Sequence, residues 1–134
     1  MTITELHDNF SISGELTESD IDKLKAAGIT TLINLRPDGE QPDQTNDAQW
    51  QALCESHGIE YVHIPVKPCQ YNATDIEKFA HNLHDSSVVH AFCKTGTRAV
   101  HLWALANREH LSLEQIRQVI APKGYNIDMI QDQF

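Results

Sequence analysis

Positive charge is scarce in this chain of 134 residues. Ten lysines and arginines stand against 19 aspartates and glutamates, which gives a formal net charge of −9. Such an acidic balance argues against binding to the phosphate backbone of nucleic acids and against docking on anionic membranes. A net-negative protein can still bind an anion, but only at a local positive site. We therefore expect neither nucleic acid nor membrane among its partners.

Cysteines are also few, and long apolar runs are missing. Cys54, Cys69 and Cys93 are far apart in the sequence and form neither a C-x-x-C pair nor an even-numbered disulfide framework. Reduced thiols in a cytoplasmic protein are the default expectation for this pattern. The N-terminal stretch MTITELHDNF lacks the basic and apolar regions of a signal peptide. No apolar run approaches the ~20 residues that a membrane helix needs.

The remaining composition is that of an ordinary folded domain. Hydrophobic residues make up 40% and charged residues 22% of the sequence, and we find no repeat, low-complexity segment or linker. A chain of this length can bury one substantial core. We therefore expect a single domain over residues 1–134.

The order of local patterns predicts an α/β fold. Apolar or alternating segments that are typical of strands lie at residues 10–13, 29–35, 59–66 and 88–92. Helical stripes or helix-start signals lie at residues 17–27, 48–56, 74–83, 97–106, 112–120 and 126–131. This alternation indicates a sandwich with a central, mostly parallel sheet of about four to five strands flanked by helices. In such sheets, ligands bind beyond the carboxyl ends of the strands.

One predicted strand end carries residues that suggest chemistry. The sequence HAFCKTGTR places Cys93 directly after the strand expected at 88–92, and Arg98 follows five positions later. A thiolate is the nucleophilic form of cysteine, and the N–H groups of a tight turn and the start of the following helix would stabilise it. Arg98 adds a planar guanidinium that suits two oxygens of a tetrahedral anion. Gly96 lets the backbone approach a ligand without a Cβ clash.

We therefore predict a catalytic loop that binds an oxyanion, with Cys93 as the nucleophile and Arg98 as an anion ligand. The alternative is a buried thiol that ends a strand, followed by a surface arginine. The combination of apolar strand, cysteine, glycine-containing turn, arginine and apolar helix favours the catalytic interpretation. Backbone amides of the anion-binding loop would come from Lys94, Thr95, Gly96 and Thr97.

Several stretches within residues 10–106 resemble a known bacterial family, the phosphatase-like domain of the beta-lactamase-hydrolase-like proteins. The matching stretches are FSISGELT, AAGITTLINLRPDGE, YVHIPV and AFCKTGTRAVHLWAL. That family is similar in fold to dual-specificity protein phosphatases. The resemblance implies that Cys93 attacks phosphorus and forms a phosphocysteine, which water then hydrolyses. It also implies that Arg98 binds the equatorial oxygens of the phosphoryl group.

The same stretches depart from the phosphatase pattern at three places. Four residues separate Cys93 from Arg98, where phosphatases of this type have five and rhodaneses usually have four. Phe92 stands where the phosphatases have a histidine, and Ala99 stands where they have a hydroxyl. The stretch VKPCQ lacks the aspartate that would serve as general acid. A sulfurtransferase that forms a persulfide on Cys93 is therefore the alternative function, and a non-catalytic anion-binding module is a third.

Three further residues are second-tier candidates. Arg36 and Asp38 belong to RPDGE, together with Glu40, and could face the same cleft, with Asp38 as an acid or an orienting group. The same letters are also ordinary turn chemistry. Cys69 lies in the loop expected to cover the site and could act as a resolving thiol for Cys93, although such a residue more often packs as a small hydrophobic group.

We expect no metal and no cofactor. His81 and His84 lie three positions apart on a predicted helix, but no clear third ligand accompanies them. The expected binding partner is a small oxyanion or a phosphorylated substrate.

Overall fold

In the computed structural model, which describes residues 2–84 and 86–134, five strands form one sheet in the order β1-β2-β5-β3-β4. The strands are β1 (Thr4–His7), β2 (Phe10–Ser13), β3 (Thr31–Asn34), β4 (Glu60–His63) and β5 (Val89–Phe92). Neighbouring strands from β2 to β4 run parallel, and β1 pairs antiparallel with β2. The predicted mostly parallel sheet is confirmed.

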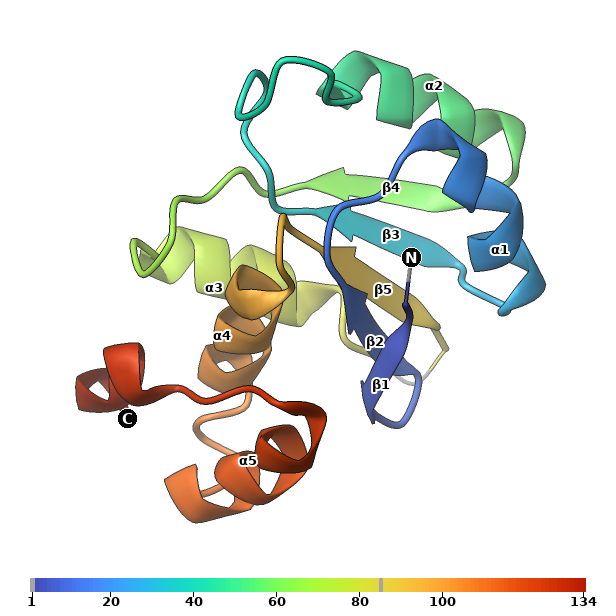
Figure 1. Ribbon diagram of the computed structural model, residues 1–134. Coiled ribbons are helices and arrows are strands. Elements are labelled where there is room, and N and C mark those ends of the chain that lie inside the picture. The colour runs from blue at the N-terminus through green and yellow to red at the C-terminus, as the bar shows by residue number, and fades with distance from the viewer. Residues whose placement is uncertain (1, 85) are drawn as a thin grey trace.

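Helices cover both faces of this sheet (Figure 1). They are α1 (Ile21–Ala26), α2 (Asp47–Ser56), α3 (Ala73–His81), α4 (Thr97–Ala106) and α5 (Leu113–Ile120). Helices α1 and α2 lie on one face and α3 and α4 on the other, while α5 contacts β1. Short 3-10 turns span Glu18–Asp20, Ala121–Lys123 and Asp128–Gln133. None of the helices in the described part of the chain is long and apolar enough to cross a membrane.

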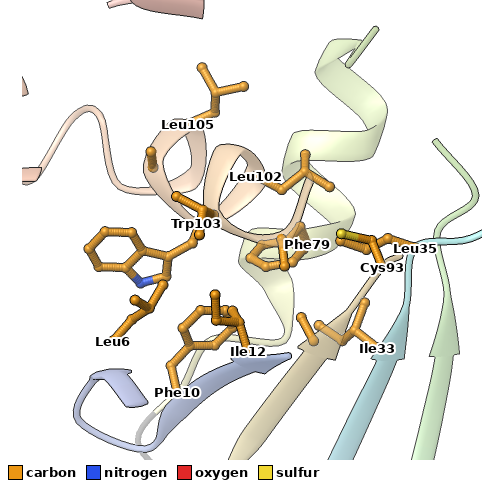
Figure 2. Close-up of a cluster of buried hydrophobic side chains, with 14 of the residues drawn as sticks. Leu6, Phe10, Ile12, Ile33, Leu35, Phe79, Cys93, Leu102, Trp103 and Leu105 are labelled. Atoms are coloured by element: carbon orange, nitrogen blue, oxygen red, sulfur yellow. The ribbon is translucent and has the colours of Figure 1, made fainter. Parts of the chain in front are cut away.

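Side chains alternate between two apolar layers, one on each face of the sheet. Ile12, Ile33 and Ala91 point to the layer under α3 and α4, where Trp103 is also buried. Figure 2 shows this layer, which holds the side chain of Cys93 as well. Phe92 points to the opposite layer because successive strand residues face opposite sides.

Local patterns located most elements, with three differences. The helix expected at residues 126–131 is a 3-10 turn over Asp128–Gln133. The strand β1 was missed, because Thr4–His7 has one buried residue and is held by pairing with β2 rather than by an apolar run. Helix α3 begins after Asn72, earlier than the start at Thr74 that the sequence pattern indicated. The Asn72 side chain accepts from the N–H of Asp75, and the Asp75 carboxylate accepts from the N–H of Asn72. Asparagine caps a helix as well as threonine does, so the earlier residue starts it.

Candidate active site

Cys93 is the first residue beyond β5, at the carboxyl edge of the sheet. Its side chain is fully buried and lies in the same apolar layer as Leu35 and Leu102 (Figure 2). The residue before it, Phe92, packs on the opposite face, so strand alternation turns Cys93 toward α4. The backbone N–H of Gly96 donates a hydrogen bond to the Sγ of Cys93 at 3.1 Å. The thiol therefore has a polar partner inside an otherwise apolar layer.

The loop turns sharply between Cys93 and the start of α4. Gly96 is the N-cap of α4 and has a φ of 90°, a left-handed conformation that glycine adopts without steric cost. Helix α4 has ten residues and no acidic residue in its first turn, so its unpaired N–H groups give a positive end next to the loop. The Thr95 hydroxyl donates to that of Thr97 at 3.1 Å, at the surface. These features suit a loop that binds an anion.

Arg98 lies in the first turn of α4, and its guanidinium is held by two neighbours. Nη1 donates to Oε2 of Glu40 at 2.8 Å and to the carbonyl oxygen of Val66 at 2.9 Å. Nη2 donates to Oε1 of Glu40 at 2.8 Å. A guanidinium has five N–H groups, and the described residues accept from three of them. The N–H of Nε and the second N–H of Nη2 remain for another ligand. That second pair can hold two oxygens of a tetrahedral anion.

Glu40 also contacts a second buried arginine. The Nε of Arg36 donates to Oε1 of Glu40 at 3.1 Å, and the exposed Glu15 lies 3.7 Å from the Nη1 of Arg36. The hydrogen bond from Arg98 lowers the pKa of Glu40, although partial burial acts in the opposite direction. Burial by itself would lower the pKa of Arg98, but the hydrogen bonds that Arg98 donates to Glu40, together with the nearby Cys93, raise it. Two buried guanidinium groups therefore share one partly buried carboxylate, and a second, exposed carboxylate lies at the edge of the group.

The end of β2 supports the loop from the other side. The N–H of Glu15 donates to the carbonyl oxygen of Lys94 at 3.0 Å. A Cβ added to Gly14 would lie 2.9 Å from the same oxygen, which is closer than real side chains come. Glycine is therefore needed here for the close approach of two backbones.

A buried polar network stands next to this contact. Nδ1 of His90 lies 2.8 Å from the Oγ of Ser11, and Nε2 lies 2.8 Å from the Oγ of Ser13. The Ser13 hydroxyl donates to the carbonyl oxygen of Gly14, so it must accept from His90. The imidazole proton is thereby assigned to Nε2, and Nδ1 accepts from Ser11. Burial lowers the pKa of His90 to about 4, which agrees with a neutral ring.

The structure brings Cys93, Arg98 and the loop between them together, with Arg36 joined through Glu40. Asp38 is exposed and accepts a hydrogen bond from the N–H of Asp47 at 2.8 Å, a contact that supports the start of α2. Its role as an acid stays a prediction.

Cys69 is partly buried, has a φ of 63° and packs against the apolar layer that contains Cys93. Its role as a resolving thiol also stays a prediction.

Two features describe the surroundings of the site. A hollow of about 530 Å³ has Arg36 in its wall, together with Glu15, Leu16, Thr17, Asp20 and residues 41–45. Among residues 2–84 and 86–134, no three His, Cys, Asp or Glu side chains gather as metal ligands would. The groups gathered around Cys93 are donors that suit an oxyanion.

Sequence comparison identifies the family. The family model of the phosphatase-like domain of Beta-lactamase hydrolase-like protein matches residues 2–109. The chain belongs to this family. It is 34% identical over 109 residues to a Beta-lactamase hydrolase-like protein of Xylella fastidiosa (strain Temecula1 / ATCC 700964). The aligned region covers 79% of this chain and 25% of the relative. The phosphatase-like domain thus spans about a quarter of that relative's length.

Solved structures agree with this assignment. A candidate phosphatase from Neisseria meningitidis Z2491 superposes with a TM-score of 0.85 at 29% identity, over 99% of this chain and 96% of that chain. Tk-PTP in its active form gives a TM-score of 0.75 at 18% identity, over 98% and 90% of the two chains. At that identity the likeness shows the fold alone. The expected phosphatase-like fold and family are confirmed.

Sequence reasoning missed three supports of the site. Glu40 was named as a residue that could face the cleft but not as the partner of Arg98. Gly14 was not named as a support, and neither was Tyr125, whose hydroxyl donates a hydrogen bond to the carbonyl oxygen of Thr95. A signal existed for the first two, because both follow strands that flank β5 in the sheet. Residues after adjacent parallel strands meet at one edge. No comparable signal pointed to Tyr125, which follows the last α-helix.

Proposed function

We propose that this domain is a cysteine-dependent phosphatase, a phosphoric monoester hydrolase that works through a phosphocysteine on Cys93. The observation that carries the proposal is the arrangement of the Cys93 thiol, the Gly96 amide and the Arg98 guanidinium around one loop. The family and the fold support it. The loop would stabilise negative charge on the phosphoryl oxygens, which is where such catalysis gains most.

The reaction needs two displacements at phosphorus. In the first, the Cys93 thiolate attacks, an S–P bond forms, the P–O bond to the leaving group breaks, and the leaving oxygen takes the electron pair. In the second, water attacks phosphorus, the S–P bond breaks, a proton goes to solvent, and phosphate and the thiolate are released. Arg98 would bind equatorial oxygens through Nε and Nη2 in both steps.

Proton transfer to the leaving group is the weak point of this site. The carboxylate that reaches Arg98 is Glu40, but both of its oxygens accept hydrogen bonds from arginine and its pKa is lowered. Glu40 is therefore a poor proton donor. A missing general acid typically costs ~10²–10⁴-fold in rate. We expect phosphates with acidic leaving groups to be hydrolysed much faster than alkyl phosphates.

The decisive experiment is paired. Purified wild type should hydrolyse p-nitrophenyl phosphate, vanadate should inhibit it, and Cys93→Ser should abolish turnover. Mass spectrometry of a quenched reaction should find one phosphoryl group on Cys93. A wild-type protein with no turnover on any aryl phosphate would refute the proposal.

The four-residue spacing between Cys93 and Arg98 favours a second candidate, a sulfurtransferase. In that reaction the Cys93 thiolate attacks the outer sulfur of thiosulfate, sulfite leaves with the electron pair, and a persulfide remains. Cyanide then takes the outer sulfur and regenerates the thiolate. The same protein preparation is treated with thiosulfate, and one extra sulfur on Cys93 with cyanide turnover supports this candidate. Anion binding without either turnover would indicate the non-catalytic module.

The substrate that we propose is a small phosphorylated compound. The hollow beside Arg36 offers room next to the site, and the net charge of −9 disfavours nucleic acid and anionic membranes. A reducing cytoplasm is the setting that we propose, because Cys93 would remain a thiol there.

A further inference from the structure

The segment beyond α5 returns to the active-site loop. The 3-10 turn Ala121–Lys123 is followed by Gly124, which has a φ of 90° and reverses the chain. Tyr125 then lies half-buried, and its hydroxyl donates a hydrogen bond to the carbonyl oxygen of Thr95 at 3.1 Å. The family match ends at residue 109, so this contact comes from outside the matched region.

The peptide group that Tyr125 contacts is the same one that faces the thiol. The carbonyl of Thr95 and the N–H of Gly96 belong to one peptide, and in a trans peptide they point in opposite directions. On one side the oxygen accepts from Tyr125. On the other side the N–H donates to the Sγ of Cys93 at 3.1 Å. Phenol, peptide and thiol therefore form one continuous row of hydrogen bonds.

Hydrogen bonds that are linked in a chain strengthen one another. A donor placed on a carbonyl oxygen polarises the amide and makes its N–H a better donor, especially where water is excluded. Cys93 is fully buried, so the Gly96 N–H has no competition from solvent at the sulfur. A thiolate gains more from such a donor than a neutral thiol does.

Packing holds the phenol in this position. A Cβ added to Gly96 would lie 3.2 Å from the Cζ of Tyr125 and closer still to the hydroxyl oxygen, so glycine leaves room for the ring. Burial and the nearby Cys93 raise the pKa of Tyr125. The phenol thus keeps its proton at neutral pH and remains a donor.

We propose that Tyr125 is a positioning residue for the active-site thiol, which it serves by orienting and polarising the peptide between Thr95 and Gly96. The hydroxyl touches neither the substrate nor the sulfur, and acts through that peptide alone. The inference rests on the proposed function only in taking Cys93 as the reactive group. It applies equally to phosphoryl and sulfur transfer, because both begin with the thiolate.

The test is the reactivity of the thiol in Tyr125→Phe, which removes one oxygen and leaves the ring. The rate of alkylation of Cys93 by iodoacetamide is followed by mass spectrometry from pH 5 to pH 10. We expect the rate at pH 7 to fall by roughly threefold to tenfold, and the midpoint of the pH profile to move upward. The control is Tyr61→Phe, which removes a hydroxyl that donates to Asp47. Its profile should match that of wild type.

The direction of the change separates this role from a structural one. If the hydrogen bond from Tyr125 merely held the loop in place, its loss would open the buried site and speed the alkylation of Cys93. A profile equal to that of wild type, or a faster reaction, would overturn the inference. Alkylation of Cys54 in the same samples reports general loosening, since that thiol is buried elsewhere.

The outcome is independent of the proposed function. A shifted profile in a protein with no phosphatase turnover would support the inference and refute the phosphatase. If wild type hydrolysed aryl phosphates but the Tyr125→Phe profile did not shift, the phosphatase would be supported and the role of Tyr125 would be refuted.

Discussion

Two thiols lie on opposite faces of the same sheet, and both are fully buried, but their surroundings differ in kind. Cys54 lies in α2 beside Trp50 in an apolar layer, and burial raises its pKa to about 11. Cys93 accepts a hydrogen bond from the N–H of Gly96 and lies near Arg98. Burial by itself makes a thiol inert. Burial together with oriented donors is the setting in which a thiolate is stabilised, and it supports the anion site that we propose at Cys93.

Each face of the sheet also has buried polar groups, which serve different ends. On the Cys93 side, Arg98 and Glu40 form a charged pair that keeps two N–H groups of Arg98 available for a ligand. On the Cys54 side, Ser11 and Ser13 enclose His90 and satisfy both of its nitrogens. The first group leaves N–H donors for the anion that we propose, whereas both nitrogens of His90 already have partners.

The largest expected difference between the two thiols is in catalysis. Cys93→Ser should remove phosphatase turnover entirely, because a serine hydroxyl at neutral pH does not replace the thiolate. Cys54→Ser should keep kcat close to that of wild type while lowering stability, because it buries a hydroxyl in an apolar layer. Steady-state hydrolysis of p-nitrophenyl phosphate and urea unfolding measure the two effects. Equal loss of turnover in both variants would contradict the view that Cys93 is reactive and Cys54 is not.

Arg98→Lys tests whether the Cys93 side depends on the shape of the guanidinium. Lysine keeps the charge but cannot bond Glu40 with two nitrogens and hold an anion at the same time. We expect kcat/KM to fall by about 10²–10³-fold. The matched control is Arg108→Lys at an exposed position, which should change kcat/KM by less than about twofold. A similar fall in both would show that the effect is not local.

Glu40→Gln tests the charged pair itself. The change leaves two buried arginines without their carboxylate, and we expect a loss of about 3 kcal/mol in the free energy of unfolding at pH 7. Because the pKa of Glu40 is lowered by folding, its stabilisation is present above pH 4.5 and is lost as the pH falls further. The difference from wild type should therefore shrink toward pH 3 in urea titrations. Glu109→Gln, at an exposed position, is the control.

His90 gives a smaller effect, on the Cys54 side. Burial lowers its pKa from 6.5 to about 4, so the unfolded chain binds a proton between these values and the folded chain does not. Stability therefore falls as the pH drops through this window, by about 2 kcal/mol between pH 7 and pH 5.

His90→Gln should lack this part of the pH dependence, whatever its stability at pH 7. Urea unfolding at the two pH values measures it, with the exposed His110→Gln as the control. If the stability of His90→Gln depended on pH as strongly as that of wild type, the assignment of a neutral, buried His90 would be wrong.

Much of the fold and half of the site could be predicted because their signals are local. The apolar strand before Cys93, the glycine in the turn and the apolar helix after Arg98 are neighbours in the chain. Which charged residue of RPDGE reaches the site could not be predicted from local signals. Whether Asp38 or Glu40 reaches Arg98 depends on the path of the turn after β3, and the structure assigns Asp38 to α2 and Glu40 to the site.

The sequence by itself determined the order of strands and helices and the placement of a cysteine, a glycine and an arginine in one short loop. Only the tertiary structure decided what surrounds that loop. Its partners Gly14, Glu40 and Tyr125 are remote in sequence and meet it because the sheet places β2 and β3 on either side of β5, while the segment after α5 folds back. Adjacency in the chain sets the first kind of contact, and packing through space sets the second.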